Sequence, residues 1–445
     1  MKQVTFDNNS NNIGALNTFL VGGAVRDELL NRHVVERDYL VVASTPEQMI
    51  SLGFSQVGKD FPVFLHPKTK EEYALARTER KQGSGYTGFV CYAEPDVTIE
   101  EDLIRRDLTV NAMAMELDKD GNSNGTIIDP YNGKKDLDAR ILRHVSDAFV
   151  EDPLRVLRVA RFSARYHSYG FTIADETMTL MQEISASGEL AQLSAERLWK
   201  EMQRSLTEPH PEVFFKVLRA CGALKKMWPE LDALWGVPNP PLWHPEICSG
   251  IHTMMVLQQA VRLTAELDEQ SSCQIRFAAV CHDLGKGITD QNLWPSHRGH
   301  ESYGLPLVEK ICLQLKVPTL YKTLALKVCE HHLHCHKAFE LKASTLLNIF
   351  NQLDVWRKPD EFSAFIMACQ ADFNGRENFE ELDYPQGKYL HACVIAAKKI
   401  NAKIFVEQGL KGVKIKEAMY DGRLIEIKKI KAEYVQINEN LKNES

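Results

Sequence analysis

Short apolar runs interrupted by turn residues characterise residues 40–140, whereas helical periodicity dominates from about residue 141 onward. Apolar stretches at 62–66 and 72–77 flank the turn signal of residues 67–70, and this arrangement predicts a β-hairpin. A sheet-bearing first part followed by a long series of helices is an α+β pattern. We therefore predict a small mixed sheet with helices near the N-terminus and an all-α remainder.

Two adjacent glycines lie where an apolar run meets a helical segment. Leu20 and Val21 precede Gly22 and Gly23, and Arg26 follows in the helical segment. A strand, a tight turn and a helix in this order offer backbone N–H groups and a helix N-terminus to a phosphate. Glycine allows close backbone approach, and a guanidinium group suits phosphate oxygens. A glycine pair alone usually marks an ordinary turn.

Two carboxylates, Glu36 and Asp38, stand at positions i and i+2 as the chain enters the apolar run 39–42. On a strand these positions face the same way, so both acids can converge on one metal ion. The glycine turn, the arginine and the acids together are far more specific than any one of them.

A second charged cluster contains Arg105, Arg106, Asp107 and Asn111 on a predicted helix. Paired arginines suit a triphosphate, and the Asp and Asn side chains suit a ribose hydroxyl. A solvated helix face is the commoner explanation of an isolated Arg-Arg-Asp.

Acids and a proline at residues 151–153 predict the start of another helix. Arg155, Arg158 and Arg161 recur every three residues with Asp152 one step before them, so the four share a stripe of the helix. The opposite face is expected in the core through Leu154, Leu157 and Phe162. The alternative explanation of the stripe is a solvated basic face.

Further along, Arg197 and Glu201 stand at i and i+4. Such an ion pair more often stiffens a helix than contacts a substrate, so we expect a supporting role for both residues.

Histidines crowd after a proline-rich linker at residues 238–245: nine of the fifteen lie from His244 to His336. His282 and Asp283 are adjacent at a predicted helix end, and His252 lies one helix earlier. These side chains offer nitrogen and oxygen ligands to a divalent metal. A lone His252 would more often be a packed core histidine.

The amino-acid composition narrows the classes of protein to which the chain can belong. A chain of 445 residues is long enough for two to four domains, and 25% charged residues is ordinary for a globular protein. The net charge of −7 argues against nucleic-acid binding driven by overall charge. Local basic faces could still bind RNA. Residues 398–431 carry a surplus of lysines that could contact RNA phosphates, and the alternative is that they form a solvated helical tail.

The compartment is predicted from what the sequence contains. Apolar runs stay shorter than the about 18 residues that span a bilayer. The polar, Asn-rich residues 1–12 are expected to be a disordered extension and not a signal peptide. Ten cysteines without Cys-x-x-Cys pairs favour reduced thiols, so we expect a cytoplasmic protein without membrane contact.

These motifs together resemble a known family. The glycine turn with its acids, the Arg-Arg-Asp cluster, the 151–162 helix and the His-Asp pair are similar to those of the class II tRNA nucleotidyltransferases, or CCA-adding enzymes, in their bacterial form with an HD phosphohydrolase domain. The resemblance runs from about residue 18 to beyond residue 420. It implies the following organisation: an N-terminal extension at 1–17, a polymerase-beta-like nucleotidyltransferase head at 18–140, a helical neck and body at 141–237, an HD domain at 245–345 and a helical tail at 346–445 that is a candidate for tRNA contact.

The resemblance also implies an activity, the addition and repair of the 3′-terminal CCA of tRNA from CTP and ATP. Glu36 and Asp38 would be the catalytic acids, holding two Mg²⁺ ions. Asp152 and Arg155 would read the base, because C and A share an exocyclic amine beside a ring acceptor. The nucleotide-binding residues implied in this way are Gly22, Gly23, Arg26, Arg106, Asp107, Asn111, Asp152, Arg155, Arg158 and Arg161.

Two further features of the head follow from the resemblance. Glu72 would be a third carboxylate opposite the first two, although a solvent-facing strand acid is an equal alternative. Residues 78–86 would form a mobile loop beside the nucleotide.

For the HD domain the resemblance implies phosphohydrolase activity. His252, His282 and Asp283 would hold a divalent metal such as Ni²⁺, Mn²⁺ or Mg²⁺. Further candidate ligands or phosphate contacts are His300, His332 and His336. The acid expected directly after His332 is replaced by a leucine.

The chain also departs from the family pattern. Glu36 stands where the family has aspartate, and Asn31 stands where it usually has glycine. Two alternatives therefore remain: a diverged paralogue acting mainly as a hydrolase, and a tRNA-binding factor without turnover. The HD motif argues against a poly(A)-adding relative. A monomer or a homodimer is expected.

Overall fold

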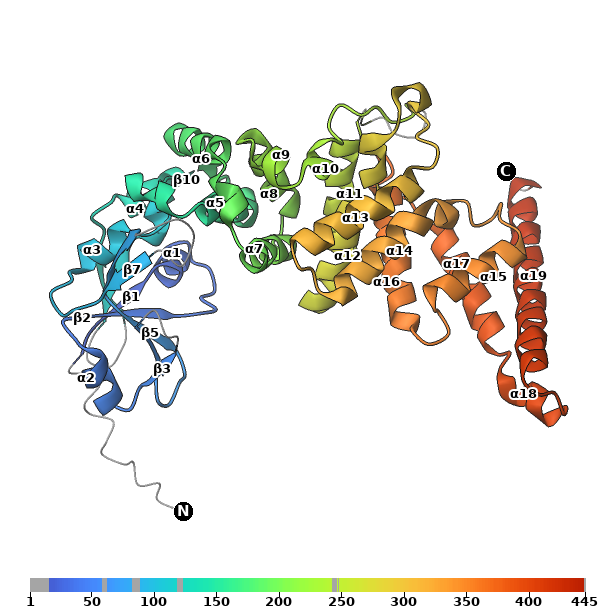
Figure 1. Ribbon diagram of the computed structural model, residues 1–445, viewed down its shortest axis with the longest axis horizontal. Coiled ribbons are helices and arrows are strands. Elements are labelled where there is room, and N and C mark those ends of the chain that lie inside the picture. Colours follow the sequence, from blue (N-terminus) through green and yellow to red (C-terminus); the bar gives the residue numbers. More distant parts are fainter. Residues whose placement is uncertain are drawn as a thin grey trace, which may run out of the picture. The chain divides into compact units, whose positions relative to one another are not determined.

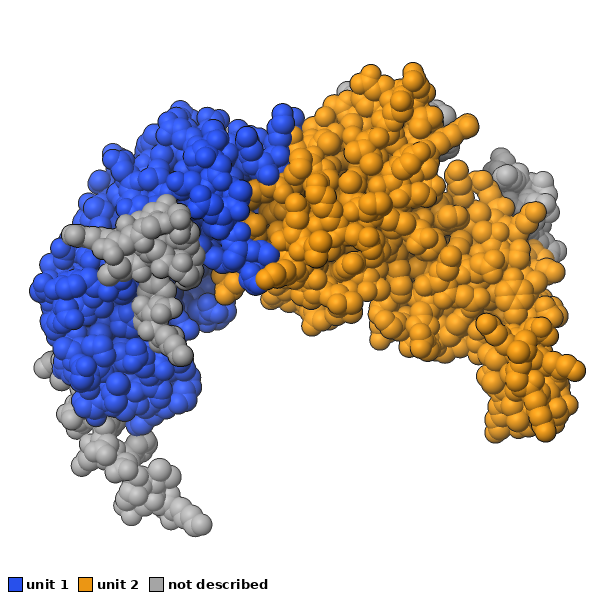
Figure 2. Space-filling view, in the orientation of Figure 1, with its two compact units in different colours: residues 1–197, 213–226 blue, residues 198–212, 227–445 orange. Residues whose placement is uncertain are grey.

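The computed structural model describes residues 16–57, 62–81, 89–117, 123–241, 246 and 248–443. Two compact units divide the chain, one comprising residues 1–197 with 213–226 and the other residues 198–212 with 227–445 (Figure 2). The expected N-terminal extension at residues 1–12 lies outside the described residues, as does His244.

A seven-stranded mixed sheet forms the centre of the first unit (Figure 1). Its strands, in spatial order, are β3 (Ser55–Val57), β4 (Val63–Leu65), β5 (Glu72–Leu75), β2 (Asp38–Val42), β1 (Asn17–Val21), β8 (Ala114–Leu117) and β9 (Ser123–Ile128). Neighbouring strands are antiparallel except for β2 and β5, which run parallel. The β4–β5 pair confirms the predicted hairpin.

Continuous apolar runs explain why the central strands β1 and β2 are buried on both faces. On one face, Phe19 and Val21 of β1 and Leu40 of β2 pack with Leu103 and Ala114 in one core cluster.

The remaining strands of the first unit form two small pairs. β6 (Thr78–Lys81) pairs with β7 (Phe89–Tyr92), and β10 (Ile141–Leu142) pairs with β11 (Thr172–Ile173). The start of the expected mobile loop is therefore strand, and its residues 82–86 lie outside the described residues.

Helices surround and follow the sheet. They are α1 (Gly23–Leu29), α2 (Pro46–Ser51), α3 (Ile99–Ile104), η4 (Thr109–Asn111, a 3-10 helix like every η), α4 (Gly133–Ala139), η5 (Asp147–Glu151), α5 (Leu154–Tyr166), η6 (His167–Tyr169), α6 (Asp175–Ser187), η7 (Glu189–Gln192), α7 (Ala195–Thr207), α8 (Pro211–Ala220) and α9 (Ala223–Met227). The predicted core face of α5 is confirmed, since Leu154, Leu157 and Phe162 are buried.

The second unit consists of helices among its described residues. They are α10 (Pro229–Asp232), α11 (Ser249–Leu263), α12 (Glu269–Cys281), η8 (Leu284–Ile288), η9 (Gln291–Leu293), α13 (His300–Gln314), α14 (Thr319–His336), α15 (Ala343–Leu353), α16 (Pro359–Asn374), α17 (Pro385–Lys398), α18 (Ala402–Glu407) and α19 (Val413–Asn443). The α+β prediction is confirmed.

Four of these helices, α11, α12, α14 and α16, pack together, and α13 lies on α14 and η8 (Figure 1). Small residues let the helices approach closely: Ala260, Ala279 and Ala371 meet in one buried cluster with Val256. Close helix packing brings polar side chains from different helices within bonding distance of one another.

The C-terminal helices pack on the same unit. α19 lies along α17 and α15, and the Tyr389 ring lies 4.9 Å from Phe339 and 5.0 Å from Tyr434, measured between centroids. Lys431 donates to the carbonyl of Phe339 at 3.1 Å, so this lysine of the basic tail is tied to the protein. Among the described residues, no helix is both long and apolar enough to cross a membrane.

All ten cysteines are free, and nine of them are buried, as the expected reduced thiols require.

Candidate functional site

Several chain segments meet at one end of the large sheet. β1 ends where antiparallel β2 begins, so Val21 pairs with Asp38, and parallel β5 pairs Glu72 with the same aspartate. The N–H of Gly22 donates to the carbonyl of Met113 at 3.1 Å, which ties the glycine turn to the start of β8. The glycine turn and the acids therefore lie together, as the sequence predicted.

The acidic cluster of this sheet end comprises Glu36, Asp38 and Glu72, and all three are exposed. β2 begins at Asp38, so Glu36 lies in the loop before the strand, which corrects the predicted strand geometry. Although Asp38 as a residue is exposed, partial burial of its carboxyl group and the Glu72 carboxylate raise the pKa of Asp38, Arg106 opposes that rise, and Glu36 adds to it. Carboxylates that disfavour one another's charge are stabilised by a nearby cation.

Arg106 lies against the glycine turn. It follows the end of α3 and is not within that helix, contrary to the prediction. Its Nη2 pairs with Asp102 at 3.2 Å, and its Nη1 donates to the Asn111 carbonyl at 3.4 Å. Gly22 has a φ of +67°, and a Cβ there would lie 2.7 Å from Nη1 of Arg106. The close approach of arginine and turn therefore requires glycine.

A chain of polar contacts joins α1, η4 and α5. Arg26 pairs with Asp27 at 3.0 Å and donates to the Asn111 side chain. Asn111 Nδ2 donates to Asp107 Oδ1 at 2.9 Å, and Asp107 Oδ2 pairs with Arg158 at 2.7 Å. Burial would raise the pKa of Asp107, but Arg158 and Asn111 hold this pKa well below its usual range. The network is a charge-compensated connection between sheet and helix.

Arg26 is the most buried member of this network, with 3% of its surface exposed. Its guanidinium carbon lies 4.9 Å from the ring centroid of Tyr166 and 5.5 Å from that of Phe162. Tyr166 also donates to Asp27 at 3.1 Å. Arg26 thus packs between α1 and α5. Gly23, which begins α1, would place a Cβ 3.3 Å from the Arg26 guanidinium.

The predicted base-reading aspartate has a partner on another helix. Asp152 lies just before α5, and its two oxygens accept from Nη2 of Arg197 on α7 at 2.8 and 3.1 Å. Glu201, on the same helix as Arg197, is buried. Arg197 therefore supports the Asp152 carboxylate directly.

The remaining arginines of the stripe differ in exposure. Arg155 is half-buried and donates to the carbonyls of Ala148, at 2.9 Å, and Arg105. Arg161 is buried, with its guanidinium carbon 4.7 Å from the Phe162 centroid. The predicted stripe of arginines therefore becomes more buried along α5, from the half-buried Arg155 to the buried Arg161.

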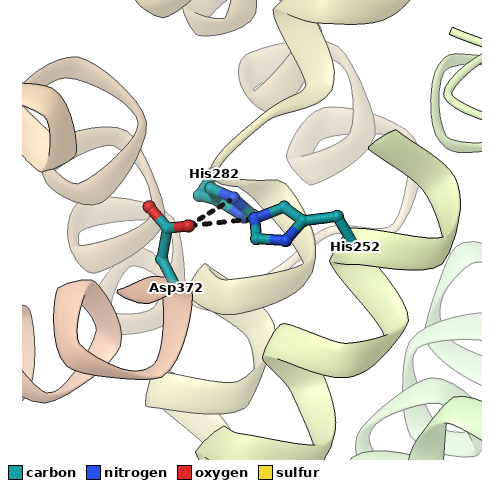
Figure 3. Close-up of side chains that lie close together, drawn as sticks. All are labelled: His252, His282 and Asp372. Atoms are coloured by element: carbon teal, nitrogen blue, oxygen red, sulfur yellow. Dashed lines mark hydrogen bonds and ion pairs between the residues drawn. The ribbon is translucent and has the colours of Figure 1, made fainter. Parts of the chain in front are cut away.

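In the second unit, helices α11, α12 and α16 converge on a buried histidine cluster. His252, His282 and Asp372 point toward one another (Figure 3). Asp372 Oδ1 lies 3.0 Å from Nε2 of His252 and 3.6 Å from Nε2 of His282. One ligand atom from each lies within 4.8 Å of the others, a spacing that suits a metal ion.

A second group lies beside the first. Asp283 Oδ1 is 3.1 Å from Nε2 of His300 and 3.6 Å from Nε2 of His332. The other oxygen of Asp283 lies 3.2 Å from Nε2 of His282. His252 and all three histidines named here are buried, so the two groups form one continuous polar centre inside the helices.

The charges of this centre compensate one another only in part. Burial alone would lower the pKa of His282, but Asp283 and Asp372 outweigh that effect and raise it to about 9. Burial lowers the pKa of His332 to about 3. The carboxylates that favour a proton on His282 also favour a metal ion at the same nitrogen. The 3.2 Å contact of His282 Nε2 with Asp283 Oδ2 and the 3.1 Å contact of His300 Nε2 with Asp283 Oδ1 lack hydrogen-bond geometry, which fits a metal ion between these groups.

The sequence interpretation missed Asp372, the acid that joins His252 and His282. It sought this acid directly after His332, whereas α16 supplies it from a distant part of the chain. The available signal was a carboxylate in the mostly apolar stretch of α16 that follows its acidic first turn. His336 donates from Nε2 to Asp372 Oδ2 at 2.6 Å. It is therefore a partner of the acid.

The predicted proline-rich linker also contributes to the centre. Asn239 is buried and accepts from Lys286 at 3.2 Å, and Lys286 pairs with Asp283 Oδ2 at 2.6 Å. The linker is thus partly built into the helical unit.

Known families match three parts of the chain. Residues 18–143 match the poly A polymerase head domain, residues 170–234 match a probable RNA- and SrmB-binding site of polymerase A, and residues 250–357 match the HD domain.

Several solved structures share the fold. The structure of a CCA-adding enzyme in apo form II has a TM-score of 0.64 at 17% identity and covers 97% of this chain and 96% of its own. The Thermotoga maritima CCA-adding enzyme complexed with tRNA has a TM-score of 0.60 at 18% identity over 96% of this chain and 92% of its own. A CCA-adding enzyme in complex with CTP has a TM-score of 0.61 at 19% identity over 94% and 87%.

Sequence relatives are much closer. The multifunctional CCA protein of Pseudoalteromonas atlantica is 56% identical over 92% of this chain and 98% of its own length. That of Pasteurella multocida is 54% identical over 93% and 97%. The chain therefore belongs to the multifunctional CCA proteins, a family of CCA-adding enzymes that carry an HD domain.

Proposed function

We propose that this protein adds and repairs the 3′-terminal CCA of tRNA from CTP and ATP, and that its HD domain hydrolyses phosphate esters. The observation that carries the first activity is the acidic cluster beside the glycine turn and Arg106 at one end of the sheet. Membership in the family supports both activities. We place the protein in the cytoplasm, where its ten free thiols would remain reduced.

The proposed organisation is a transferase head at 18–140, a neck and body at 141–237, an HD domain at 245–345 and a tail at 346–445. The family matches at 18–143, 170–234 and 250–357 support this division.

In the head, Glu36 and Asp38 would hold Mg²⁺, with Glu72 beside them. When bound, Mg²⁺ neutralises phosphate charge and lowers the pKa of the attacking hydroxyl. The tRNA 3′-oxygen forms a bond to the α-phosphorus, the bond to the bridging oxygen breaks, pyrophosphate leaves and the hydroxyl proton passes to solvent. The protein contributes placement and charge.

The triphosphate would bind between the glycine turn and Arg106. Gly22 and Gly23 allow the close approach, and Arg106 supplies the positive charge that lowers the pKa of Asp38. Arg26 is buried and engaged with Asn111, so we assign it a positioning role for the turn.

The ribose and base would lie along η4 and α5. Asp107 and Asn111 suit a ribose hydroxyl, and Arg158, paired with Asp107, and the buried Arg161 would add positive charge from α5. Asp152 would accept from the exocyclic amine of C or A, and Arg155 would donate to the adjacent ring acceptor.

In the HD domain, His252, His282, Asp283 and Asp372 would hold a divalent metal, with Ni²⁺, Mn²⁺ and Mg²⁺ as candidates. Such a metal acts as a Lewis acid on a phosphoryl oxygen. Lys286, held by Asn239, lies 2.6 Å from Asp283 Oδ2 and would offer a positive charge to the phosphate.

The test is incubation of the purified chain with Mg²⁺, labelled CTP and a tRNA that ends before its CCA. Two cytidines should be added, and one adenosine should follow when ATP is supplied. The Asp38→Asn variant should lose incorporation about 10³-fold, because metal-ion catalysis contributes several kcal/mol. Its binding to tRNA should remain.

No incorporation by the unaltered chain would overturn the transferase proposal. Retained phosphohydrolase activity in that case would support a diverged hydrolase. Salt-sensitive tRNA binding without either activity would support a tRNA-binding factor.

A further inference from the structure

We infer that Asp102 is a positioning residue of the nucleotide site, and that its carboxylate sets both the arginine for the triphosphate and the arginine for the base. Asp102 lies in α3 with none of its surface exposed, so it would act through these arginines and not by touching the nucleotide. The inference rests on the proposed roles of Arg106 and Arg155 and adds the residue that places both side chains.

The carboxylate of Asp102 is surrounded by N–H groups. Oδ1 accepts from Nε of Arg105 at 3.1 Å, from Nη2 of the same guanidinium at 2.6 Å and from the backbone N–H of Arg77 at 3.3 Å. Oδ2 accepts from Nη2 of Arg106 at 3.2 Å. Burying a charge is costly unless the charge is paired and hydrogen-bonded, and both oxygens of Asp102 meet that condition. One buried carboxylate therefore ties two arginines to the same point.

The spacing along the sequence produces this arrangement. Arg105 and Arg106 follow Asp102 by three and four residues, the separations at which side chains near a helix share one face. A capping box of Thr98 and Glu101 fixes the start of the short helix. Burial alone would raise the pKa of Asp102, but the two guanidinium groups outweigh that effect and lower it. The carboxylate therefore keeps the negative charge that holds both arginines.

The bond to Oδ2 fixes the side chain of Arg106 beside the glycine turn. Nη1 of Arg106 donates to the carbonyl of Asn111 at 3.4 Å, and a Cβ on Gly22 would lie 2.7 Å from that nitrogen. Asp102 and Asn111 thus hold the guanidinium plane at two of its nitrogens. A side chain that is already ordered loses less conformational freedom when a phosphate binds, so this placement favours the triphosphate.

The bonds to Oδ1 fix the main chain that supports Arg155. Arg105 donates from Nε to the carbonyl of Arg77 at 3.1 Å as well as to Asp102, so its side chain joins α3 to the segment after β5. The carbonyl of Arg105 in turn accepts from Nη2 of Arg155. Loss of the Asp102 carboxylate would release Arg105 and, with it, a carbonyl that places Arg155.

The experiment measures two binding ratios in the full chain. Equilibrium dialysis with labelled CTP, CMP and UTP, with Mg²⁺ and without tRNA, gives the preference for CTP over CMP and for CTP over UTP. Asp102→Asn keeps the size of the side chain and removes its charge. The first preference should fall about tenfold through Arg106 and the second about threefold through Arg155. A merely structural role would lower the folded fraction and leave both ratios unchanged.

Double variants test whether the effect passes through the arginines. Arg106→Gln should lower the preference for CTP over CMP, and adding Asp102→Asn should change that ratio by less than about twofold further, because no arginine remains to be positioned. The same pair of changes should still lower the preference for CTP over UTP. Arg155→Gln should behave in the converse way. Additive losses in both double variants would overturn the inference.

The matched control is Glu100→Gln, which makes the same change of charge at an exposed position of α3 and should leave both ratios at the parent values. If Asp102→Asn does not fold, Arg105→Gln replaces it: this change leaves the bond from Arg106 to Oδ2, so only the preference for CTP over UTP should fall. Unchanged ratios in the folded variants would overturn the inference.

Failure of the inference and failure of the proposed function are distinguishable because the ratios need no turnover. A parent chain that prefers CTP in both ratios without incorporating it would overturn the transferase proposal alone. A parent chain with neither preference would overturn both, since the arginines would then not contact a nucleotide.

Discussion

The acidic cluster of the sheet and the histidine cluster of the helical unit differ in burial. Glu36, Asp38 and Glu72 are exposed at a strand end. His282 and Asp283 are each 1% exposed and lie among helices that fix them from several directions. An exposed cluster can adapt as a ligand arrives, whereas a buried one must be assembled during folding.

The difference teaches how each proposed site selects its ligand. In the head, mutual repulsion of carboxylates creates affinity for a cation, and a nucleotide can supply the remaining ligands. In the HD domain, backbone carbonyls orient the rings of His282 and His300 in advance. We therefore expect the same small chemical change to have a large effect in the second site and a small effect in the first.

Asp372→Glu gives the largest expected effect. The added methylene must enter a packed helix interior, where Asp372 already meets His252 at 3.0 Å and His336 at 2.6 Å. We expect metal affinity to fall at least as much as it does when a hydrogen-bond partner of a metal ligand is lost, which is about 10–100-fold. Equilibrium dialysis with Mn²⁺ measures it, and Asp360→Glu at the exposed start of α16 is the matched control. Unchanged affinity would show that the buried cluster adapts as readily as the exposed one.

Gly285→Ala should have the next largest effect, because the new Cβ would lie 1.9 Å from the His300 carbonyl oxygen. Overpacking of this kind costs about 1–3 kcal/mol, and the shift should also separate Asp283 from His300. Thermal unfolding and Mn²⁺ stoichiometry are the measurements.

The control is Gly287→Ala, whose Cβ would approach the Ala233 Cβ at a milder 3.2 Å. If both variants unfolded at the parent temperature, the close crossing of η8 and α13 would not be what holds the cluster together.

Arg197→Met tests the head at a contact that is already formed. The substitution removes Nη2 of Arg197, which donates to the two carboxylate oxygens of Asp152 at 2.8 and 3.1 Å. A charge-assisted hydrogen bond contributes about 1.5–3 kcal/mol, so selection of CTP and ATP over UTP and GTP should weaken about tenfold. Single-turnover incorporation measures it, with Lys200→Met on the exposed face of α7 as control. Equal loss of incorporation for all four nucleotides would point to a purely structural role.

The sequence predicted the head well because its signals are local. The glycine turn, Glu36 and Asp38 lie close together in the sequence, between residues 22 and 38. The pairing of β2 with β5 places Glu72 beside Asp38, whereas the sequence left open whether Glu72 faces solvent. The error at Arg106 was also local: the capping of α3 is strong at its start, but the helix ends at Ile104. Helix ends depend on contacts that a pattern does not contain.

The histidine cluster was predicted only in part because its residues come from distant helices. His252, His282 and Asp283 carried a recognisable spacing, whereas Asp372 became a neighbour through the packing of α16 on α11 and α12. The burial of Glu246 and Asn239 was not predicted for the same reason, since a proline-rich stretch gives no sign that its side chains are buried. Tertiary packing determines where these residues lie, and the local sequence does not contain that information.

Glu36→Asp should have the smallest effect and is the counterpart of Asp372→Glu. Glu36 lies in an exposed loop before β2, so removal of one methylene can be absorbed by a small movement of that loop. We expect the rate of CTP incorporation to change by less than about tenfold, well below the about 10²-fold cost of a 1 Å misplacement in a rigid site. A rise of 10²-fold or more would mean that glutamate is a defect in the head and that the exposed cluster is as rigid as the buried one. A small change would show that exposure at the strand end is what lets this chain use glutamate where its family has aspartate.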